Sequence, residues 1–115
     1  MVKNATSYSG NGLRDWLVQR VTAVILAAYT FFIMGFILVR QDITYSSWES
    51  LFSNMSMKVA TLLALLALVL HAWIGMWTIF TDYLKPVVLR ILVEVIVIIA
   101  LVWYFVWGVF LLWSV

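Results

Sequence analysis

The sequence predicts an all-α integral membrane protein with three transmembrane helices, and its composition and charge pattern carry that prediction. Hydrophobic residues make up 66% of the 115-residue chain and charged residues 10%, whereas a soluble domain is about half apolar and about a quarter charged. Three runs have no formal charge, at 21–39, 59–81 and 95–115, and a helix needs roughly 20 apolar residues to cross a bilayer. The composition excludes a water-soluble monomer and a disordered chain.

The first membrane helix is expected at about 15–39. Its uncharged run of 19 residues is longer than the roughly 7–15 residues of a signal-peptide core, and no small-residue cleavage site follows it. The polar segment at 1–13 is expected to be an N-terminal arm, and 1–115 is expected to be a single transmembrane domain. The following loop, at 40–57, mixes polar and aromatic residues and is expected to lie in the membrane interface.

The second and third membrane helices are expected at about 58–81 and 87–113. Pro86 stands at the start of the third helix, where the missing N–H of proline costs no hydrogen bond. The loop at 82–85 is very short, so we expect these two helices to be antiparallel neighbours. Large apolar residues occupy every face of the third helix, a pattern typical of a membrane anchor.

Positively charged residues are unequally divided between the two sides of the membrane. The side that holds the N-terminus and the loop at 82–85 carries five of them: Lys3, Arg14, Arg20, Lys85 and Arg90. The other side carries Arg40 and Lys58. Because cytoplasmic loops are enriched in Lys and Arg, we expect the N-terminus in the cytoplasm and the C-terminus on the outer side.

One face of the second helix carries only small or polar residues. At 100° per residue, seven of them lie within about 40° of one direction: Ala60, Ala64, Ala67, His71, Gly75, Thr78 and Asp82. Small residues let a second helix or a flat ligand approach closely. Helix packing alone explains the alanines and the glycine, so the histidine decides between these interpretations.

His71 is the only histidine, and it lies near the middle of the second span. Ionisable side chains at that depth are costly and usually functional. One interpretation is a structural hydrogen bond from a neutral imidazole. The other is axial ligation of a haem, which would need a second imidazole from another subunit. Met34 and Met76 are expected to be core residues rather than ligands. The absence of cysteine excludes disulfides, thiolate-bound iron–sulfur clusters and cysteine catalysis.

A second polar cluster is expected at the cytoplasmic edge of the second helix. Asp82 continues the stripe of His71, and Tyr83 follows it. A phenol and a carboxylate suit a quinone headgroup, because quinone carbonyl oxygens need a hydrogen-bond donor and quinone reduction consumes protons. The simpler interpretation is a solvated interface with a tyrosine in the aromatic belt. Arg20 is either an ordinary cytoplasmic charge or the partner of an anion such as a haem propionate.

A resemblance to a known family rests on two runs of sequence, HAWIGMW at 71–77 and TDYLKP at 81–86. Together they resemble the hydrophobic membrane anchor (D) subunit of succinate dehydrogenase, respiratory complex II, of the bacterial type that contains haem b. The start of the first helix is similar as well, with NG at 11–12, Asp15 and RVTA at 20–23. The resemblance covers the whole chain, and its specific part is the histidine-to-tyrosine run.

This resemblance implies roles for four residues. His71 corresponds to an axial ligand of the haem b iron, with a second histidine supplied by the partner anchor (C) subunit. Tyr83 corresponds to the tyrosine that hydrogen-bonds a ubiquinone carbonyl, and Asp82 to its acidic neighbour. Arg20 corresponds to an arginine near the haem propionates.

The resemblance also implies partners and a location. Electrons would reach ubiquinone from an iron–sulfur subunit, and a flavoprotein subunit would oxidise succinate in the tricarboxylic acid cycle. Flavin and iron–sulfur clusters therefore belong to other chains. The expected location is the bacterial cytoplasmic (inner) membrane, with a periplasmic C-terminus, in contact with lipid and without nucleic acid.

Two alternatives remain open. The chain could be a haemless, quinone-reactive anchor of a fumarate-reductase-type complex, in which His71 only packs. It could also be a non-redox membrane scaffold subunit. Catalysis by the isolated chain is the weakest interpretation, because one histidine and no cysteine leave too few reactive groups.

Overall fold

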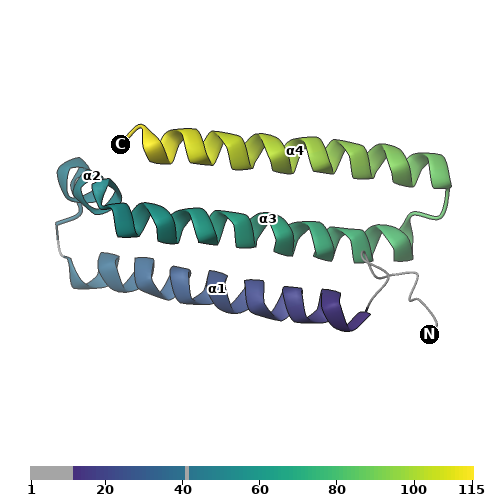
Figure 1. Cartoon of the computed structure of the whole chain (residues 1–115), viewed down its shortest axis with the longest axis horizontal. Coiled ribbons are helices and arrows are strands. Elements are labelled where there is room, and N and C mark those ends of the chain that lie inside the picture. Colours follow the sequence, from purple (N-terminus) through teal and green to yellow (C-terminus); the bar gives the residue numbers. More distant parts are fainter. Residues whose placement is uncertain (1–11, 41) are drawn as a thin grey trace.

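A computed structural model describes residues 12–40 and 42–115, and in this part of the chain all regular secondary structure is α-helix (Figure 1). Its helices are α1 (Gly12–Val39), α2 (Tyr45–Ser53), α3 (Met55–Tyr83) and α4 (Val87–Trp113). The expected N-terminal arm lies outside the described residues, except for its last two positions, which already belong to α1.

Three of the helices are long and apolar enough to span a membrane. α1, α3 and α4 contain 28, 29 and 27 residues. At 1.5 Å per residue each is about 40 Å long, which exceeds the roughly 30 Å of the hydrocarbon core. The prediction of an all-α protein with three membrane helices is confirmed.

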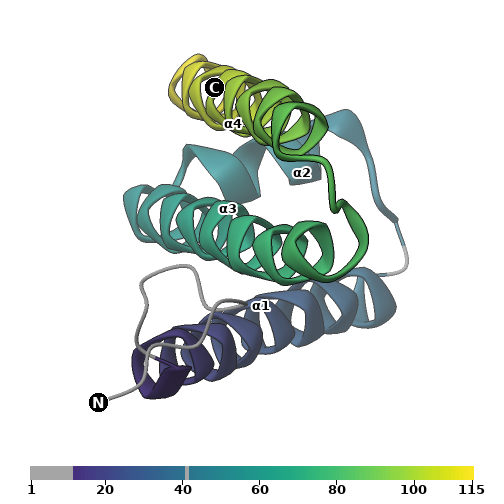
Figure 2. The ribbon, with the colours of Figure 1, turned by 90° about the vertical axis from the view of Figure 1, so that its right-hand side faces the viewer.

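α3 is the central helix of the arrangement. α1 packs on one side of it and α4 on the other, and successive long helices run in opposite directions (Figures 1 and 2). The antiparallel pairing of α3 with α4 is therefore confirmed. The first residues of α1, the last of α3 and the first of α4 meet at one end of the molecule, which we call the Tyr83 end. The opposite end holds α2 and the last residues of α4.

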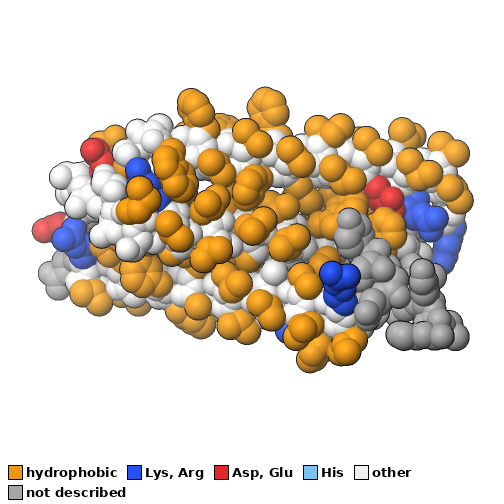
Figure 3. All heavy atoms as spheres, in the orientation of Figure 1, with side chains coloured by type: hydrophobic (Ala, Val, Ile, Leu, Met, Phe, Trp, Pro, Cys, Tyr) orange, Lys and Arg blue, Asp and Glu red, His pale blue; other side chains and the backbone are white. Residues whose placement is uncertain are grey.

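Most large apolar side chains of this chain are exposed. Among the described residues, the buried hydrophobic ones are Met57, Ala64, Ala67, Ile74 and Leu112. Hydrophobic side chains cover the middle of the face seen in Figure 3, and charged ones gather toward the two ends. In water so large an apolar surface would cause aggregation, so lipid or other membrane helices must cover it.

The loop expected at 40–57 contains a helix, which corrects that prediction. Thr44 and Ser47 cap the start of α2, because the Ser47 N–H donates to Thr44 Oγ1 and the Thr44 N–H donates to Ser47 Oγ. Asn54 separates α2 from α3, and its Oδ1 accepts from the N–H of Ser56 at 2.9 Å. α3 therefore begins at Met55, earlier than the expected residue 58.

The start of α3 is tied to the end of α4. Lys58 is only 9% exposed, and its Nζ donates to the backbone oxygen of Val115 at 3.1 Å. The same ammonium lies 5.9 Å from the ring centroid of Trp113. A charge held by a backbone oxygen and an aromatic face is compatible with burial at a membrane edge.

Candidate functional site

A polar seam runs between α1 and α3. We use this name for Gln19, Thr22 and Tyr29 of α1 with Thr61 and His71 of α3. Tyr29 and Thr61 share a hydrogen bond of 2.7 Å between their hydroxyl groups, and Thr22 Oγ1 lies 3.1 Å from His71 Nδ1. Two cross-helix polar contacts inside apolar spans link these helices more specifically than packing alone.

Sequence reasoning assigned no role to Gln19, Thr22 or Tyr29. Their spacing of three and seven residues places them on one face of α1. This spacing in the sequence indicates a polar face on α1. It was missed because the span was recognised by its lack of charged residues, a criterion that ignores uncharged polar side chains.

The small-residue stripe of α3 packs against α1. Ala64 and Ala67 are buried, and a Cβ on Gly75 would lie 3.3 Å from Nε2 of Gln19. The packing interpretation is therefore correct for the middle of the stripe. Its ends at Ala60 and Asp82 are exposed.

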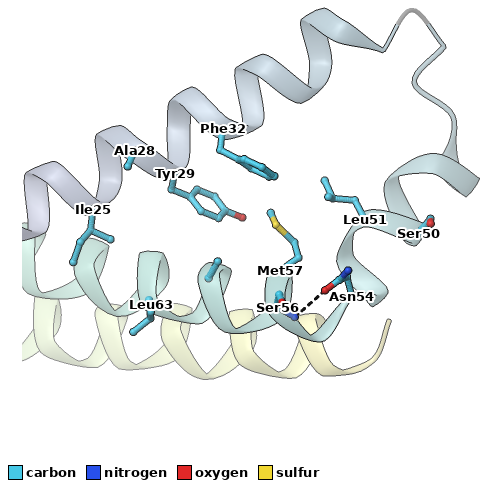
Figure 4. Close-up of a pocket in the computed structure, with 11 residues that line it drawn as sticks. Ile25, Ala28, Tyr29, Phe32, Ser50, Leu51, Asn54, Ser56, Met57 and Leu63 are labelled. Carbon is cyan, nitrogen blue, oxygen red and sulfur yellow. Dashed lines mark hydrogen bonds between the residues drawn. The ribbon is translucent and has the colours of Figure 1, made fainter.

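An apolar groove opens where α1 diverges from α3 toward α2 (Figure 4). It has a volume of about 570 Å³, and its lining includes Ile25, Tyr29, Phe32, Leu51 and Met57. Figure 4 shows Phe32 and Tyr29 pointing from α1 toward Met57 of α3. The groove lies closer to α2 than His71 does, so it is separate from the histidine.

His71 lies at mid-depth, with its imidazole half-buried. Twelve residues separate it from the end of α3 at Tyr83, which corresponds to about 18 Å. Nδ1 contacts Thr22, while Nε2 makes no hydrogen bond to any residue that the structure describes. A neutral imidazole has one nitrogen that donates and one that accepts or binds a metal. His71 therefore has one ring nitrogen free for a ligand from outside this part of the chain.

A single imidazole fits one axial position of a haem iron and no more. The described residues contain no group of three or more His, Cys, Asp and Glu side chains that could hold a bare metal ion. Met76 is half-buried. Met34 is 49% exposed, which corrects the expectation that it belongs to the core of this chain. A second axial ligand would have to come from another chain.

Asp82 and Tyr83 lie together at the last turn of α3. Tyr83 is 78% exposed, and Asp82 is exposed as well. Neither side chain makes a hydrogen bond to a described residue. Sequence reasoning placed Asp82 toward protein because it continues the His71 stripe, but no helix that the structure describes covers it. Both groups are therefore accessible to an external ligand, at about 16 Å (Asp82) and about 18 Å (Tyr83) along the helix from His71.

Arg20 is not brought to His71 within this chain. Its guanidinium lies 5.6 Å from the ring centroid of Trp16, and the side chain is exposed. Two residues correspond to about 200° of helix rotation, so Arg20 lies on nearly the opposite face of α1 from Thr22. The role of Arg20 beside a haem propionate stays a prediction. It requires the propionate to reach the face of α1 that points away from the polar seam.

Comparisons with known proteins agree on one family. Residues 2–106 match the family described as succinate dehydrogenase/fumarate reductase transmembrane subunit. The succinate dehydrogenase hydrophobic membrane anchor subunit of Coxiella burnetii is 48% identical over 105 residues, which is 91% of each chain. The subunit of the same name from Rickettsia prowazekii is 33% identical over 70% of this chain and 64% of the relative. That from Rickettsia typhi is 31% identical over 70% of this chain and 65% of the relative.

The family match covers the first two membrane spans and most of the third, and the C. burnetii relative is covered along 91% of its length. Together with the fold, this shows that the chain belongs to the succinate dehydrogenase/fumarate reductase transmembrane subunits, as a membrane anchor subunit of succinate dehydrogenase.

Proposed function

We propose that this anchor subunit holds one side of a haem b through His71 and forms part of a ubiquinone reduction site through Tyr83 and Asp82. Electrons would arrive from an iron–sulfur subunit, which receives them from a flavoprotein subunit. The observation that carries the proposal is the single imidazole at mid-depth whose Nε2 has no hydrogen-bond partner among the described residues.

The haem part of the proposal assigns one residue of this chain to the iron. His71 would bind through Nε2, and the second axial histidine would come from the partner anchor (C) subunit, since this chain has one histidine. A bound haem b supplies one-electron storage within the membrane. Arg20 would pair with a propionate group through a surface of α1 that the seam does not use.

The quinone part assigns two residues at the Tyr83 end. Tyr83 would donate its phenolic hydrogen to one carbonyl oxygen of ubiquinone, which orients and polarises the ring. Reduction to ubiquinol takes up two electrons and two protons. Asp82 is exposed beside Tyr83 and would relay protons from water to the reduced oxygen. Neither side chain is hydrogen-bonded to a residue that the structure describes, which supports this assignment.

The proposal also includes an orientation. The Tyr83 end carries most of the lysines and arginines, which supports a cytoplasmic location. The quinone site would then face the side on which soluble succinate-oxidising subunits work, and the C-terminus would be periplasmic in the bacterial inner membrane.

One experiment on the complete complex tests both parts, with His71→Ala and Tyr83→Phe compared with Tyr104→Phe. Tyr104 is an exposed tyrosine of α4 and serves as the matched control. We expect His71→Ala to remove the b-type α band from the reduced-minus-oxidised spectrum. Tyr83→Phe should keep this band and lower the rate of ubiquinone reduction by roughly 10-fold or more.

The outcomes separate the alternatives. If the complex without any substitution showed no b-type band, this would contradict haem binding and indicate a haemless, quinone-reactive anchor. Unchanged quinone kinetics in Tyr83→Phe would remove the quinone assignment. A loss equal to that of Tyr104→Phe would show a general effect of removing a tyrosine hydroxyl.

A further inference from the structure

The contact between Thr22 and His71 involves more than two atoms. Thr22 is 4% exposed, and its hydroxyl oxygen lies 3.1 Å from His71 Nδ1. The same oxygen lies 2.8 Å from the carbonyl oxygen of Val18 and 3.1 Å from that of Gln19. One hydroxyl group therefore has three polar neighbours and a single hydrogen to share among them.

The position of that hydrogen determines which nitrogen of His71 is protonated. A carbonyl oxygen cannot donate, so a hydrogen bond to Val18 or Gln19 uses the hydroxyl hydrogen of Thr22. Val18 is the nearest of the three neighbours, and this back-bond is the usual arrangement of a threonine in a membrane helix. The Thr22 oxygen then offers a lone pair to Nδ1, and Nδ1 must carry a hydrogen to complete that bond.

We propose that Thr22 is a positioning residue for His71: it fixes the tautomer with hydrogen on Nδ1 and leaves the lone pair on Nε2 for the ligand. Metal-bound histidines generally donate their other ring N–H to a nearby oxygen, and this bond sets ring orientation and ligand basicity. Thr22 is the residue of this chain that provides the oxygen. The consequence for haem rests on the proposed function, but the tautomer does not.

The rest of the seam supports a fixed ring. Tyr29 and Thr61 join the same two helices by a second hydrogen bond of 2.7 Å. On the other side of Thr22, Gln19 packs closely on Gly75. α1 and α3 are thus in contact on both sides of the Thr22–His71 pair. These contacts oppose a shift of one helix along the other, which would separate His71 from Thr22.

The tautomer can be measured directly because the chain has one histidine. The full chain, labelled with ¹⁵N-histidine and placed in lipid bilayers without haem, gives two ring-nitrogen signals in solid-state NMR. We expect a protonated, pyrrole-type signal for Nδ1 and a pyridine-type signal for Nε2. The reverse assignment would overturn the proposal. Thr22→Val should convert the pure tautomer into a mixture.

The effect on the cofactor is measured in the complete complex. Thr22→Val keeps the shape of the side chain and removes the hydroxyl, whereas Thr22→Ser keeps the hydroxyl. Thr81→Val is the matched control, because Thr81 makes the same pair of back-bonds, 3.0 Å each to Trp77 and Thr78, without a histidine. Haem content and haem reduction potential are the readouts.

We expect Thr22→Val to lower haem affinity by roughly 10–100-fold. The haem that remains should have a more positive reduction potential, since an imidazole that no longer donates through Nδ1 is a weaker electron donor to ferric iron. Thr22→Ser should restore both values, and Thr81→Val should change neither.

Three results would contradict these expectations in different ways. A Thr22→Val complex with unaltered haem content and potential overturns the role of Thr22, and so does a Thr22→Ser complex that behaves like Thr22→Val. A complex that lacks haem altogether contradicts the proposed function, while the NMR signals of the haem-free chain still decide whether Thr22 sets the tautomer.

Discussion

The hydroxyl groups of Thr78, Tyr29 and Thr61 on the membrane spans make two kinds of hydrogen bond. Thr78 donates to the carbonyl oxygen of Ile74 at 3.0 Å, whereas Tyr29 and Thr61 bond across the seam. Inside a bilayer no water replaces a hydrogen bond that is removed. The Tyr29–Thr61 bond therefore contributes to the pairing of α1 with α3, although such bonds average below about 1 kcal/mol in membrane proteins.

Tyr29→Phe should destabilise the complex by roughly 0.5–1 kcal/mol, because it removes the shared hydrogen bond and keeps the ring. Thermal unfolding of the detergent-solubilised complex measures this change. Tyr104→Phe is the control, since Tyr104 is exposed on α4 and has no hydrogen bond to the described residues. Equal melting temperatures for the two variants would show that the Tyr29–Thr61 bond contributes nothing.

Sequence reasoning found His71 but missed its contact Thr22, and the reason is physical. A histidine in a membrane span is rare because its imidazole is expensive to bury. A threonine is common there because it satisfies itself on its own helix. The spacing of Gln19, Thr22 and Tyr29 only becomes informative once α1 is known to pack on the His71 face. The roles of Asp82, Tyr83 and Arg20 stay predictions.

At the scale of helices, the three spans were predictable and α2 was not. Each span is fixed by about 20 uncharged residues, a requirement set by the bilayer. α2 has nine residues, too few for a clear periodic pattern, and depends on local caps at Thr44 and Asn54. The capping residues were visible in the sequence, but short polar loops contain many similar residues.

The packing of α3 on α4 leads to a prediction at Gly108. A Cβ there would lie 2.6 Å from Cδ2 of Leu65, whereas a Cβ on Gly35 of α1 would meet nothing within 4 Å. We therefore expect Gly108→Val to destabilise the chain by about 1–3 kcal/mol through overpacking. Gly35→Val, in open surroundings, should cost much less. Thermal unfolding compares the two, and equal losses would contradict the close approach of these helices.

The molecule as a whole is a layer of helices that needs other surfaces to complete it. Large apolar residues are exposed on α1, α3 and α4, and Nε2 of His71 has no hydrogen-bond partner among the described residues. Both features agree with membership in a family of membrane anchor subunits. The sequence predicted that this surface lies in a membrane, because the composition excluded a water-soluble monomer.

The orientation of the whole molecule is testable because the chain contains no cysteine. Ser46→Cys places a thiol on exposed α2, and Lys85→Cys places one at the Tyr83 end. In intact bacterial cells with a permeabilised outer membrane, an impermeant thiol reagent should label Cys at position 46. Position 85 should react only after the inner membrane is broken. The opposite labelling pattern would reverse the proposed topology.

The most direct test of the account is a chemical rescue of the His71 site. In His71→Gly the imidazole is missing but its space remains. We expect the purified complex of this variant to lack the b-type α band and to regain it when haem and free imidazole are supplied together. Haem without imidazole should not restore the band. A variant complex that keeps the full band with no added imidazole would show that His71 is not a haem ligand.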